Sequence, residues 1–564
     1  MKKLLALLIA LALSMTLFAC IDGEVYDSTT ENPASADVTD NSGSGTTAAQ
    51  TEQTTTEEVM TKEPTVFAYD FSKLESTLPT PTPANIPDWK GFNVLNMFMQ
   101  GGGGNDSDFD ESVFSTIADL GFNFVRLPID YRIWTYGGSW EKYDESALEN
   151  LDSALRYAFD NDIHVSINFH RGPGYTVAQP AEETNLWTDE TAQAAFAKLW
   201  GIIAHRYKDV PNEFLSFNLI NEPDITDPEV YIGAVMPAIN IIREWTPDRM
   251  IILDGLNWCS QPFIQAKEIG VALATRGYHP NTISHYQADW MQGADKYPVP
   301  EWPMLNIPSY FYGDDKPEMQ SDLVIKGNFA EETAVSVRVG TVSQSTQLVM
   351  LADGVEVYRH NIVSGAGKGA EDGSGEWKTE IFVEEWGIYQ NLFDCDFTGI
   401  IPAGTKTLTI KGGKGDWMTF DYVSFAPTSN PDAKRVLETK NKDWDVKFPA
   451  DVTMTDTGFE AEGAAQDREW LKQSYLQSWI DIRNEGVGVM VGEWGAHNRT
   501  PHTATLSWME DWLSLYKEYG FSWALWNFYG SFGIVNSGRD DVDYEQFNGF
   551  DLDRKMSDLL QEYK

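Results

Sequence analysis

From Trp89 onward the chain alternates between two hydrophobic patterns. Short apolar runs predict buried strands, and longer segments with apolar residues three or four positions apart predict helices, as at Val113, Ile117 and Leu120. Strands that alternate with helices predict an α/β fold, and eight such units predict a (β/α)8 TIM barrel. The eight predicted strands are 91–98, 124–129, 165–169, 214–220, 250–253, 271–278, 487–491 and 521–526.

The spacing of these strands breaks once, between Tyr278 and Val487. Roughly two hundred residues lie there, far more than an ordinary loop of a barrel contains. Part of the segment is typical of β structure, because Val335, Val337 and Val339 alternate with polar residues and glycine turns separate the apolar runs. Many short strands joined by such turns predict a β-sandwich.

The predicted β-sandwich occupies residues 312–427 and is inserted in the loop after strand six. It divides the catalytic barrel into a first part, 85–311, and a second part, 428–564. The insertion carries tryptophans that are candidates for binding glycan, and a rigid spacer with structural tryptophans explains them equally well. These residues are Trp377, Trp386 and Trp417.

The N-terminus has the pattern of a secretion signal, with two lysines followed by an apolar run to Phe18. The run ends in Leu-Phe-Ala-Cys, which resembles the lipobox of bacterial lipoproteins. That resemblance makes residues 1–20 a lipoprotein signal peptide and Cys20 the lipidated first residue of the mature protein. It places the protein on the extracellular face of a bacterial cell membrane. The alternative is an ordinary signal peptide with a chance cysteine.

Residues 21–84 form the predicted tether between the lipid and the barrel. The segment is acidic and rich in Thr and Ser, and it closes on a Pro-Thr-Pro-Thr-Pro run at 79–83. Such a composition buries too little apolar surface to fold.

Composition narrows the possible partners. The formal net charge of −44 disfavours nucleic acid, anionic lipid surfaces and acidic substrates, so a neutral polymer fits best and the membrane is reached only through the lipid on Cys20. Three cysteines give no disulfide framework, and no motif of metal ligands is present, so we expect no metal and no cofactor. We expect a monomer.

Two predicted strands end on a carboxylate. Strand four runs into Asn221, Glu222 and Pro223, and strand seven runs into Glu493. Side chains at the carboxyl ends of barrel strands converge on one face, where barrel enzymes hold their catalytic groups. A pair of carboxyl groups is what the hydrolysis of a glycosidic bond requires. The alternative is two strands that merely end in polar turn residues.

Five segments then give the chain a specific resemblance to glycoside hydrolase family 5. They are GFNFVRLPID, INFHRGPGY, FNLINEP, VGEWG and ALWNF, in order and at barrel spacing, within residues 89–300 and 465–564. The resemblance implies that Glu222 is the acid/base, that Glu493 is the nucleophile, and that configuration is retained.

The same resemblance assigns four supporting residues. Arg126, at the end of strand two, would orient the nucleophile, and His170 would contact the sugar at the cleavage site. Asn221 would hold the sugar 2-hydroxyl, and Trp526 would lie under the sugar ring. Trp187 and Trp258 are candidate platforms for flanking sugars, with structural packing as an equal alternative.

One stretch departs from the family pattern. Members of the family carry a His-x-Tyr pair after strand six, whereas here His279 and His285 compete for the histidine role. Tyr278 and Tyr286 compete likewise for the tyrosine role. We favour His285 and Tyr278.

The function that the sequence predicts is a retaining glycoside hydrolase acting on β-glucan or β-mannan, with endo-β-1,4-glucanase (cellulase) as the first candidate. β-Mannanase, xyloglucanase and β-1,3-glucanase are alternatives on the same barrel, because subsite loops decide the substrate. A surface glycan-binding protein that no longer hydrolyses is an alternative of a different class.

Overall fold

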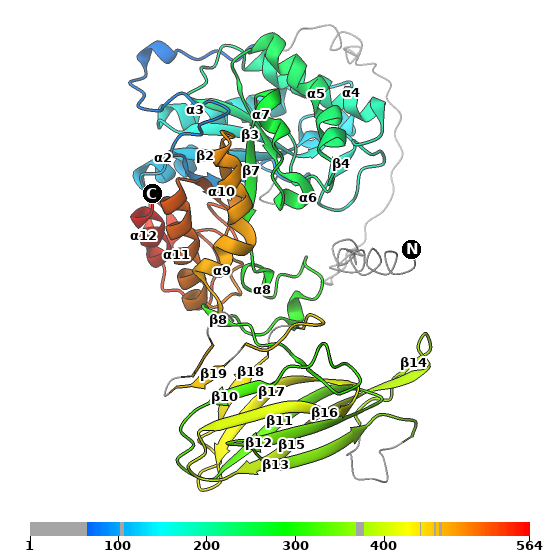
Figure 1. Cartoon of the computed structure of the whole chain (residues 1–564). Helices are drawn as coiled ribbons and strands as arrows, with labels where there is room; N and C mark the ends of the chain where they lie inside the picture. Colours follow the sequence, from blue (N-terminus) through cyan, green and yellow to red (C-terminus); the bar gives the residue numbers. More distant parts are fainter. Residues whose placement is uncertain are drawn as a thin grey trace, which may run out of the picture. The chain divides into compact units, whose positions relative to one another are not determined.

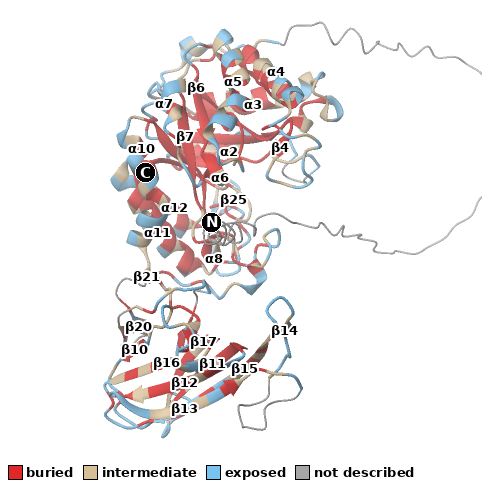
Figure 2. Ribbon diagram, turned by 45° about the vertical axis from the view of Figure 1, so that its right-hand side comes forward, coloured by how far each residue is buried: buried red, intermediate tan, exposed pale blue. Residues whose placement is uncertain are grey.

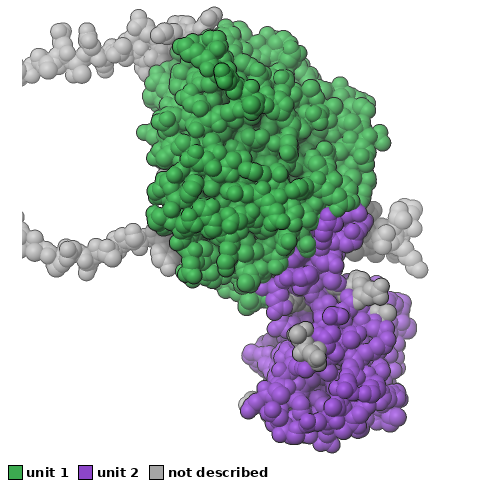
Figure 3. All heavy atoms as spheres, turned by 90° about the vertical axis from the view of Figure 1, so that its left-hand side faces the viewer, with its two compact units in different colours: residues 1–299, 475–564 green, residues 300–474 purple. Residues whose placement is uncertain are grey.

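A computed structural model describes residues 65–564 except 102–105, 368–376, 440–441, 450, 456–457 and 462–464. The predicted signal peptide, Cys20 and most of the predicted tether lie outside the described residues. In the described ranges no helix combines the length and the apolar character needed to cross a membrane. The chain forms two compact units, coloured separately in Figure 3. Unit 1 is Met1–Val299 with Tyr475–Lys564, and unit 2 is Pro300–Ser474.

Unit 1 contains the predicted barrel (Figure 1). Its strands are β1 (Lys90–Asn93), β2 (Phe124–Asp130), β3 (His164–Gly172), β5 (Leu215–Asn218), β6 (Met250–Asp254), β7 (Ala272–Gly277), β22 (Val489–Trp494) and β23 (Ser522–Leu525). Among the described residues these eight strands pair in parallel in the order β2-β1-β23-β22-β7-β6-β5-β3. β2 also pairs with β3, which closes the ring, so the prediction of a TIM barrel is confirmed.

Helices follow most of the barrel strands, and aspartates define where several of them begin. Asp110, Asp144, Asp189 and Asp227 each accept a backbone N–H of the first helical turn, as N-cap residues do. The helices of unit 1 are α2 (Glu111–Asp119), α3 (Glu145–Asp160), α4 (Glu190–Arg206), α5 (Pro228–Trp245), α6 (Leu256–Cys259), α7 (Gln265–Ile269), α8 (Asn281–Ser284), α10 (Gln477–Asn484), α11 (His502–Tyr519) and α12 (Arg554–Glu562).

The barrel strands are buried along their whole length, as Figure 2 shows. Inside the barrel, Trp89 stacks on His164 with ring centroids 3.9 Å apart, and small side chains such as Ala272, Ala274 and Ala524 leave room for the indole. This packing fills one part of the interior with apolar side chains. Polar residues of the strands lie in another part of the interior, where Arg126 binds Asn93, Asn218 and Glu493.

Four predicted strands are shorter than expected: β7 and β23 each lose one residue at either end, and β1 and β5 lose more. β1 ends at Asn93 instead of 98, and β5 ends at Asn218 instead of 220. Beyond the end of β5 the chain turns into a left-handed backbone at Glu222, where φ is 44°. β22, by contrast, extends beyond the predicted 491 to Trp494, so that Glu493 lies within a strand.

The predicted limit of the tether at residue 84 is wrong. Phe67 is buried and donates its N–H to the carbonyl of Arg206, and its ring lies 5.6 Å from that of Tyr207 and 6.1 Å from that of Phe159. A short 3₁₀ helix follows at Phe71–Lys73. Aromatic residues at 67, 69 and 71 therefore give this segment enough apolar surface to fold onto the barrel.

Unit 2 is a sandwich of two sheets. One sheet has the order β13-β12-β16-β10-β19-β20, and the other has the order β14-β15-β11-β17-β18 with β9 also paired to β17. The strands are β9 (Tyr310–Tyr312), β10 (Leu323–Lys326), β11 (Thr333–Ser343), β12 (Ser345–Ala352), β13 (Val355–Val363), β14 (Phe382–Val383), β15 (Ile388–Ile401), β16 (Thr407–Gly415), β17 (Trp417–Pro427), β18 (Arg435–Glu438), β19 (Val452–Met454) and β20 (Phe459–Glu460). Apolar residues of both sheets form one core.

The insertion is wider than the predicted 312–427. Unit 2 spans Pro300–Ser474, so the barrel parts end at Val299 and resume at Tyr475 instead of at 311 and 428. The predicted limits missed β18, β19 and β20, which are short strands without a clear alternating pattern. The insertion does follow the sixth barrel strand, β7, as predicted.

Candidate active site

The two glutamates singled out from the sequence lie at the carboxyl ends of the fourth and seventh barrel strands. Glu493 is in β22 and is almost fully buried, with 4% of its side chain exposed. Glu222 follows the end of β5 and keeps 19% of its side chain exposed. The pair therefore combines a buried carboxylate with a more accessible carboxyl group.

The backbone of Glu222 is held in its left-handed conformation from two sides. Tyr175 donates its hydroxyl to the carbonyl oxygen of Glu222 at 2.6 Å. The N–H of Glu222 donates to Oδ2 of Asp254 at 2.9 Å. A non-glycine residue at positive φ is strained and persists only when its surroundings fix it, a situation that is concentrated at functional sites.

Arg126 binds Glu493 directly. Its Nη1 donates to Oε1 of Glu493 at 2.6 Å, and its Nη2 donates to Oδ1 of Asn221 at 2.9 Å. Asn93 and Asn218 accept the remaining hydrogen bonds of the guanidinium. The prediction that Arg126 ends strand two is wrong, because Arg126 is the third residue of β2 and points into the barrel interior from there.

The structure distinguishes between the two histidines and the two tyrosines that are candidates for the active-site roles after strand six. Tyr278 donates its hydroxyl to Oε2 of Glu493 at 3.2 Å, and the ring of His285 lies 5.1 Å from that of Tyr278. His279 instead stacks on Tyr475 at 3.9 Å. The hydroxyl of Tyr286 accepts from its neighbour Gln287. Of these four residues, Tyr278 thus binds Glu493 and His285 lies beside Tyr278.

Arg276 is one of two charged residues of this site that the sequence did not reveal. It lies in β7, its Nε donates to Oε1 of Glu222 at 2.9 Å, and its Nη2 is 3.3 Å from Oε1 of Glu493. One guanidinium therefore contacts both carboxyl groups. Arg276 stands two residues before Tyr278, where the His-x-Tyr pattern of the family would carry its histidine. Because the pattern predicts a histidine at this position, it assigns no role to an arginine there.

Asp254 completes a buried group of charges and was also missed. It accepts from Nη2 of Arg276 at 2.5 Å and lies 4.0 Å from Arg126. Although its burial acts in the opposite direction, the two arginines hold the pKa of Asp254 below its ordinary value. The sequence did carry a signal, since Asp254 ends the apolar run of strand five as Glu222 and Glu493 end theirs.

Burial and the charges of this group together set the pKa of Glu222. The two guanidinium groups are those of Arg126 and Arg276, and the three carboxyl groups are those of Glu222, Glu493 and Asp254. The five side chains together carry one net negative charge when all are ionised, so one added proton makes their total charge zero. Burial, opposed by the charge of Arg276 and aided by those of Glu493 and Asp254, raises the pKa of Glu222 to about 7. Glu222 is therefore suited to donate a proton near neutral pH, while Glu493 stays hydrogen-bonded to Arg126.

His170, Asn221 and Trp526 form one side of the site. Nε2 of His170 lies 3.3 Å from Nδ2 of Asn221, and the His170 ring stacks on Trp526 at 5.5 Å. Burial first, and then the positive charge of Arg126, hold the pKa of His170 well below its ordinary value, so the ring is neutral. An indole and a neutral imidazole side by side offer a stacking face and hydrogen bonds to a sugar.

The two candidate platforms differ from each other. Trp187 is 8% exposed and donates from Nε1 to Oδ1 of Asp224 at 2.7 Å, so it supports the loop that carries Glu222. Trp258 is 37% exposed and follows Asn257 in a left-handed turn. Only Trp258 presents a substantial open surface to a ligand. In the described part of the chain no group of three or more His, Cys, Asp or Glu side chains is arranged to hold a metal ion.

Comparison with known proteins agrees with this geometry. The model of the family described as "Cellulase (glycosyl hydrolase family 5)" matches residues 82–291 and 442–531, more than half of the chain. Endoglucanase C of Acetivibrio thermocellus is 26% identical over 196 residues, which are 34% of this chain and 57% of that protein. Endoglucanase 3 of Fibrobacter succinogenes is 24% identical over 260 residues, 42% of this chain and 38% of that protein.

The chain therefore spans a little over half of the length of Endoglucanase C and less than half of the length of Endoglucanase 3. A crystal structure of a glycoside hydrolase aligns with 85% of this chain and 99% of its own, at 25% identity and a TM-score of 0.54. The match of the family model covers both halves of the barrel and includes Glu222 and Glu493. On this evidence the chain belongs to glycosyl hydrolase family 5, the cellulase family.

Proposed function

We propose that the protein is a retaining glycoside hydrolase that cleaves β-linked polysaccharide within the chain. The observation that carries this proposal is a pair of carboxyl groups, those of Glu222 and Glu493, on the one guanidinium of Arg276, with the pKa of Glu222 raised to about 7. Acid-assisted displacement at a glycosidic carbon needs two neighbouring carboxyl groups, one of which can donate a proton near neutral pH.

The roles follow from the contacts. Glu493 accepts hydrogen bonds from Arg126 and Tyr278, which fix the orientation of its carboxyl group for attack. Glu222 has its pKa raised to about 7, so it holds a proton below that pH, and it is the more exposed of the two, which suits a group that exchanges protons with the leaving sugar and with water.

In the first step an oxygen of Glu493 forms a bond to the anomeric carbon. The bond between that carbon and the leaving oxygen breaks, and the leaving oxygen takes the proton of Glu222. In the second step Glu222 accepts a proton from water, and the water oxygen displaces Glu493. Two inversions retain the configuration of the sugar. Asn221 and His170 would hold the hydroxyl groups of this sugar, with Trp526 beneath its ring.

A β-1,4-glucan is the substrate that we propose, because the names of the curated relatives are those of endoglucanases. The net charge of −44 disfavours an anionic sugar and favours a neutral polymer. β-Mannan, xyloglucan and β-1,3-glucan are the alternatives to test.

The test is a screen of soluble cellulose, glucomannan, xyloglucan and laminarin with sizing of the products. We expect soluble cellulose to lose viscosity early and to give a range of oligosaccharides. Glu222→Gln and Glu493→Gln should each lower turnover by about a thousandfold or more. Near-normal turnover in either variant would overturn the assignment, and binding of polysaccharide by the native chain without released reducing ends would favour the non-catalytic alternative.

We also propose that the protein is a monomer held by a lipid on Cys20 at the outer face of the bacterial membrane. The support is the lipobox-like sequence that ends at this residue. Cys20→Ser should move the protein from the membrane fraction to the medium or to a soluble fraction, with its hydrolytic activity unchanged. Equal membrane retention of the variant would contradict the proposal.

A further inference from the structure

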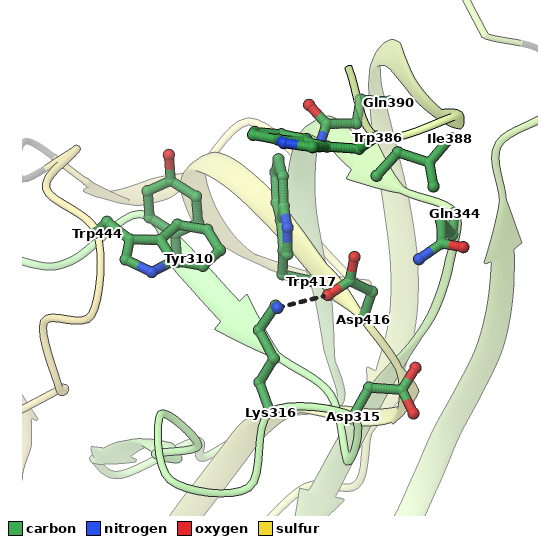
Figure 4. Close-up of a pocket in the computed structure, with 10 residues that line it drawn as sticks. All are labelled: Tyr310, Asp315, Lys316, Gln344, Trp386, Ile388, Gln390, Asp416, Trp417 and Trp444. Carbon is green, nitrogen blue, oxygen red and sulfur yellow. Dashed lines mark ion pairs between the residues drawn. The ribbon is translucent and has the colours of Figure 1, made fainter. Parts of the chain in front are cut away.

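Unit 2 contains a pocket of about 720 Å³ that the proposed reaction does not use (Figure 4). Aromatic rings and polar side chains gather around it. Tyr310 comes from β9, Trp417 from β17, Trp386 from the turn between β14 and β15, and Trp444 from the segment after β18. Four separate parts of the sandwich thus supply a ring to one hollow.

Three of the rings fix one another. Tyr310 lies 5.6 Å from Trp417 and 5.2 Å from Trp444, and the two indoles are 5.5 Å apart, all in edge-to-face geometry. Lys316 lies 5.7 Å over the ring of Trp444. Rings held by such contacts lose little freedom when a ligand stacks on them, so the pocket is organised before it binds anything.

Two of the rings that line the pocket remain open to solvent. Trp386 is 61% exposed and Trp444 is 44% exposed. Large aromatic side chains left exposed together are a sign of a binding surface, because their burial in the core would stabilise the fold more. Trp377, the third tryptophan named from the sequence, packs instead against the core of the sandwich.

The polar side chains define the chemistry of the ligand. Asp315, Gln344 and Gln390 line the pocket beside the rings and offer carboxylate and amide groups to hydroxyls. The charge of Lys316 is already paired with Asp416 at 3.4 Å. Stacking faces beside acceptors and donors, without an unpaired cation, suit a neutral polyhydroxylated ring and disfavour an anionic one.

We infer that this pocket of unit 2 is a second glycan-binding site, separate from the barrel, which holds a neutral β-glucan chain against Trp386 and Trp444. The choice of β-1,4-glucan as its probe rests on the proposed function, whereas the site itself rests on the geometry of unit 2.

The test measures partition of the full chain onto insoluble cellulose. The background chain carries Glu222→Gln to prevent turnover and Trp526→Ala to weaken binding in the barrel. Adding Trp386→Ala and Trp444→Ala should lower the partition coefficient about tenfold, since two stacking faces are lost. The matched control is Trp245→Ala on α5, which is also 44% exposed and should leave the partition unchanged. Unchanged thermal unfolding would show that each variant is folded.

Two results would overturn the inference: a background chain that does not bind cellulose, or equal binding after loss of both tryptophans. With Glu222 and Trp526 restored, the pocket variants should hydrolyse soluble cellulose normally and insoluble cellulose more slowly. If the native chain hydrolyses no glucan but the partition still falls with the pocket variants, the proposed function fails and the binding site stands. A pocket that serves a protein partner would give unchanged partition.

Discussion

Arg276 donates a hydrogen bond from Nε to Oε1 of Glu222 at 2.9 Å, and the same guanidinium reaches Glu493 at 3.3 Å. This arrangement couples the two carboxyl groups, because any change in the charge of one alters the field at the other. The family pattern after strand six carries a histidine, which is smaller and titrates near neutral pH, whereas an arginine stays charged throughout the working range.

The first prediction concerns the charge of Arg276. This charge lowers the pKa of Glu222, so Arg276→Ala should move the alkaline limb of the kcat/KM profile on soluble cellulose to higher pH. The rate at the optimum should fall by about a hundredfold, because the catalytic pair loses its shared donor. Arg276→Lys, which keeps the charge but not both contacts, should lower the rate with a smaller shift. A merely structural role would lower the rate without moving the limb.

The second prediction concerns the native pH profile. Glu222 must be protonated to act as the acid, so kcat/KM should fall as pH rises through about 7, the pKa of that group. Because the pKa in the folded state is raised above the ordinary value of 4.5, protonated Glu222 contributes stability below that value, and this contribution is lost as pH rises through about 7.

Glu222→Gln removes this ionisation and supplies the check. The Tm of the variant relative to the native chain should be higher at pH 8.5 than at pH 4, by a few degrees. Equal differences at both pH values would show that Glu222 does not have the raised pKa.

The third prediction concerns the tyrosine and the two histidines after strand six, which should differ in their effects on activity and stability. Tyr278→Phe removes the donor to Oε2 of Glu493 and should lower kcat by about ten- to hundredfold, toward the lower end of the cost of deleting a donor to the reacting groups. His285→Ala, next to Tyr278, should weaken activity, whereas His279→Ala should mainly lower the Tm because His279 packs on Tyr475. Steady-state kinetics with thermal unfolding measure both. The reverse order of effects for the two histidines would contradict the assignment.

The fourth prediction concerns the segment before the barrel. Phe67→Ala should cost about 3 kcal/mol of unfolding free energy, since a buried aromatic side chain leaves a cavity between α3 and α4. Tyr136→Ala is the control, because this ring is 52% exposed and its loss should change stability by less than about 0.5 kcal/mol. Urea unfolding followed by tryptophan fluorescence compares them. Equal effects would mean that residue 67 belongs to the tether after all.

The barrel and the place of its insertion could be predicted because each strand carries its own hydrophobic signal. The limits of the insertion could not, because strands as short as β19 and β20 show no period of their own and exist only through pairing. The glutamates were visible as polar ends of apolar runs. Arg276 was not, since a lone arginine inside a strand has no local signal and its role depends on which strands meet across the barrel.

Asp254 is an instructive intermediate case. Its position at the end of strand five carried the same signal as the glutamates, but no pattern of the sequence said that its partner would be Arg276. Contacts between residues on different strands follow from the closure of the ring, and closure is a property of the whole fold.

The place of unit 2 also fixes the order in which the enzyme is made. The ribosome completes six barrel strands, then about 175 residues of sandwich, and only then β22 and β23, which pair with β7 and β1 to close the ring. At typical rates of synthesis this interval lasts about 10–30 s. We expect the nascent barrel to remain open for that time and to lack Glu493, so hydrolytic activity arises only with the last ninety or so residues of translation.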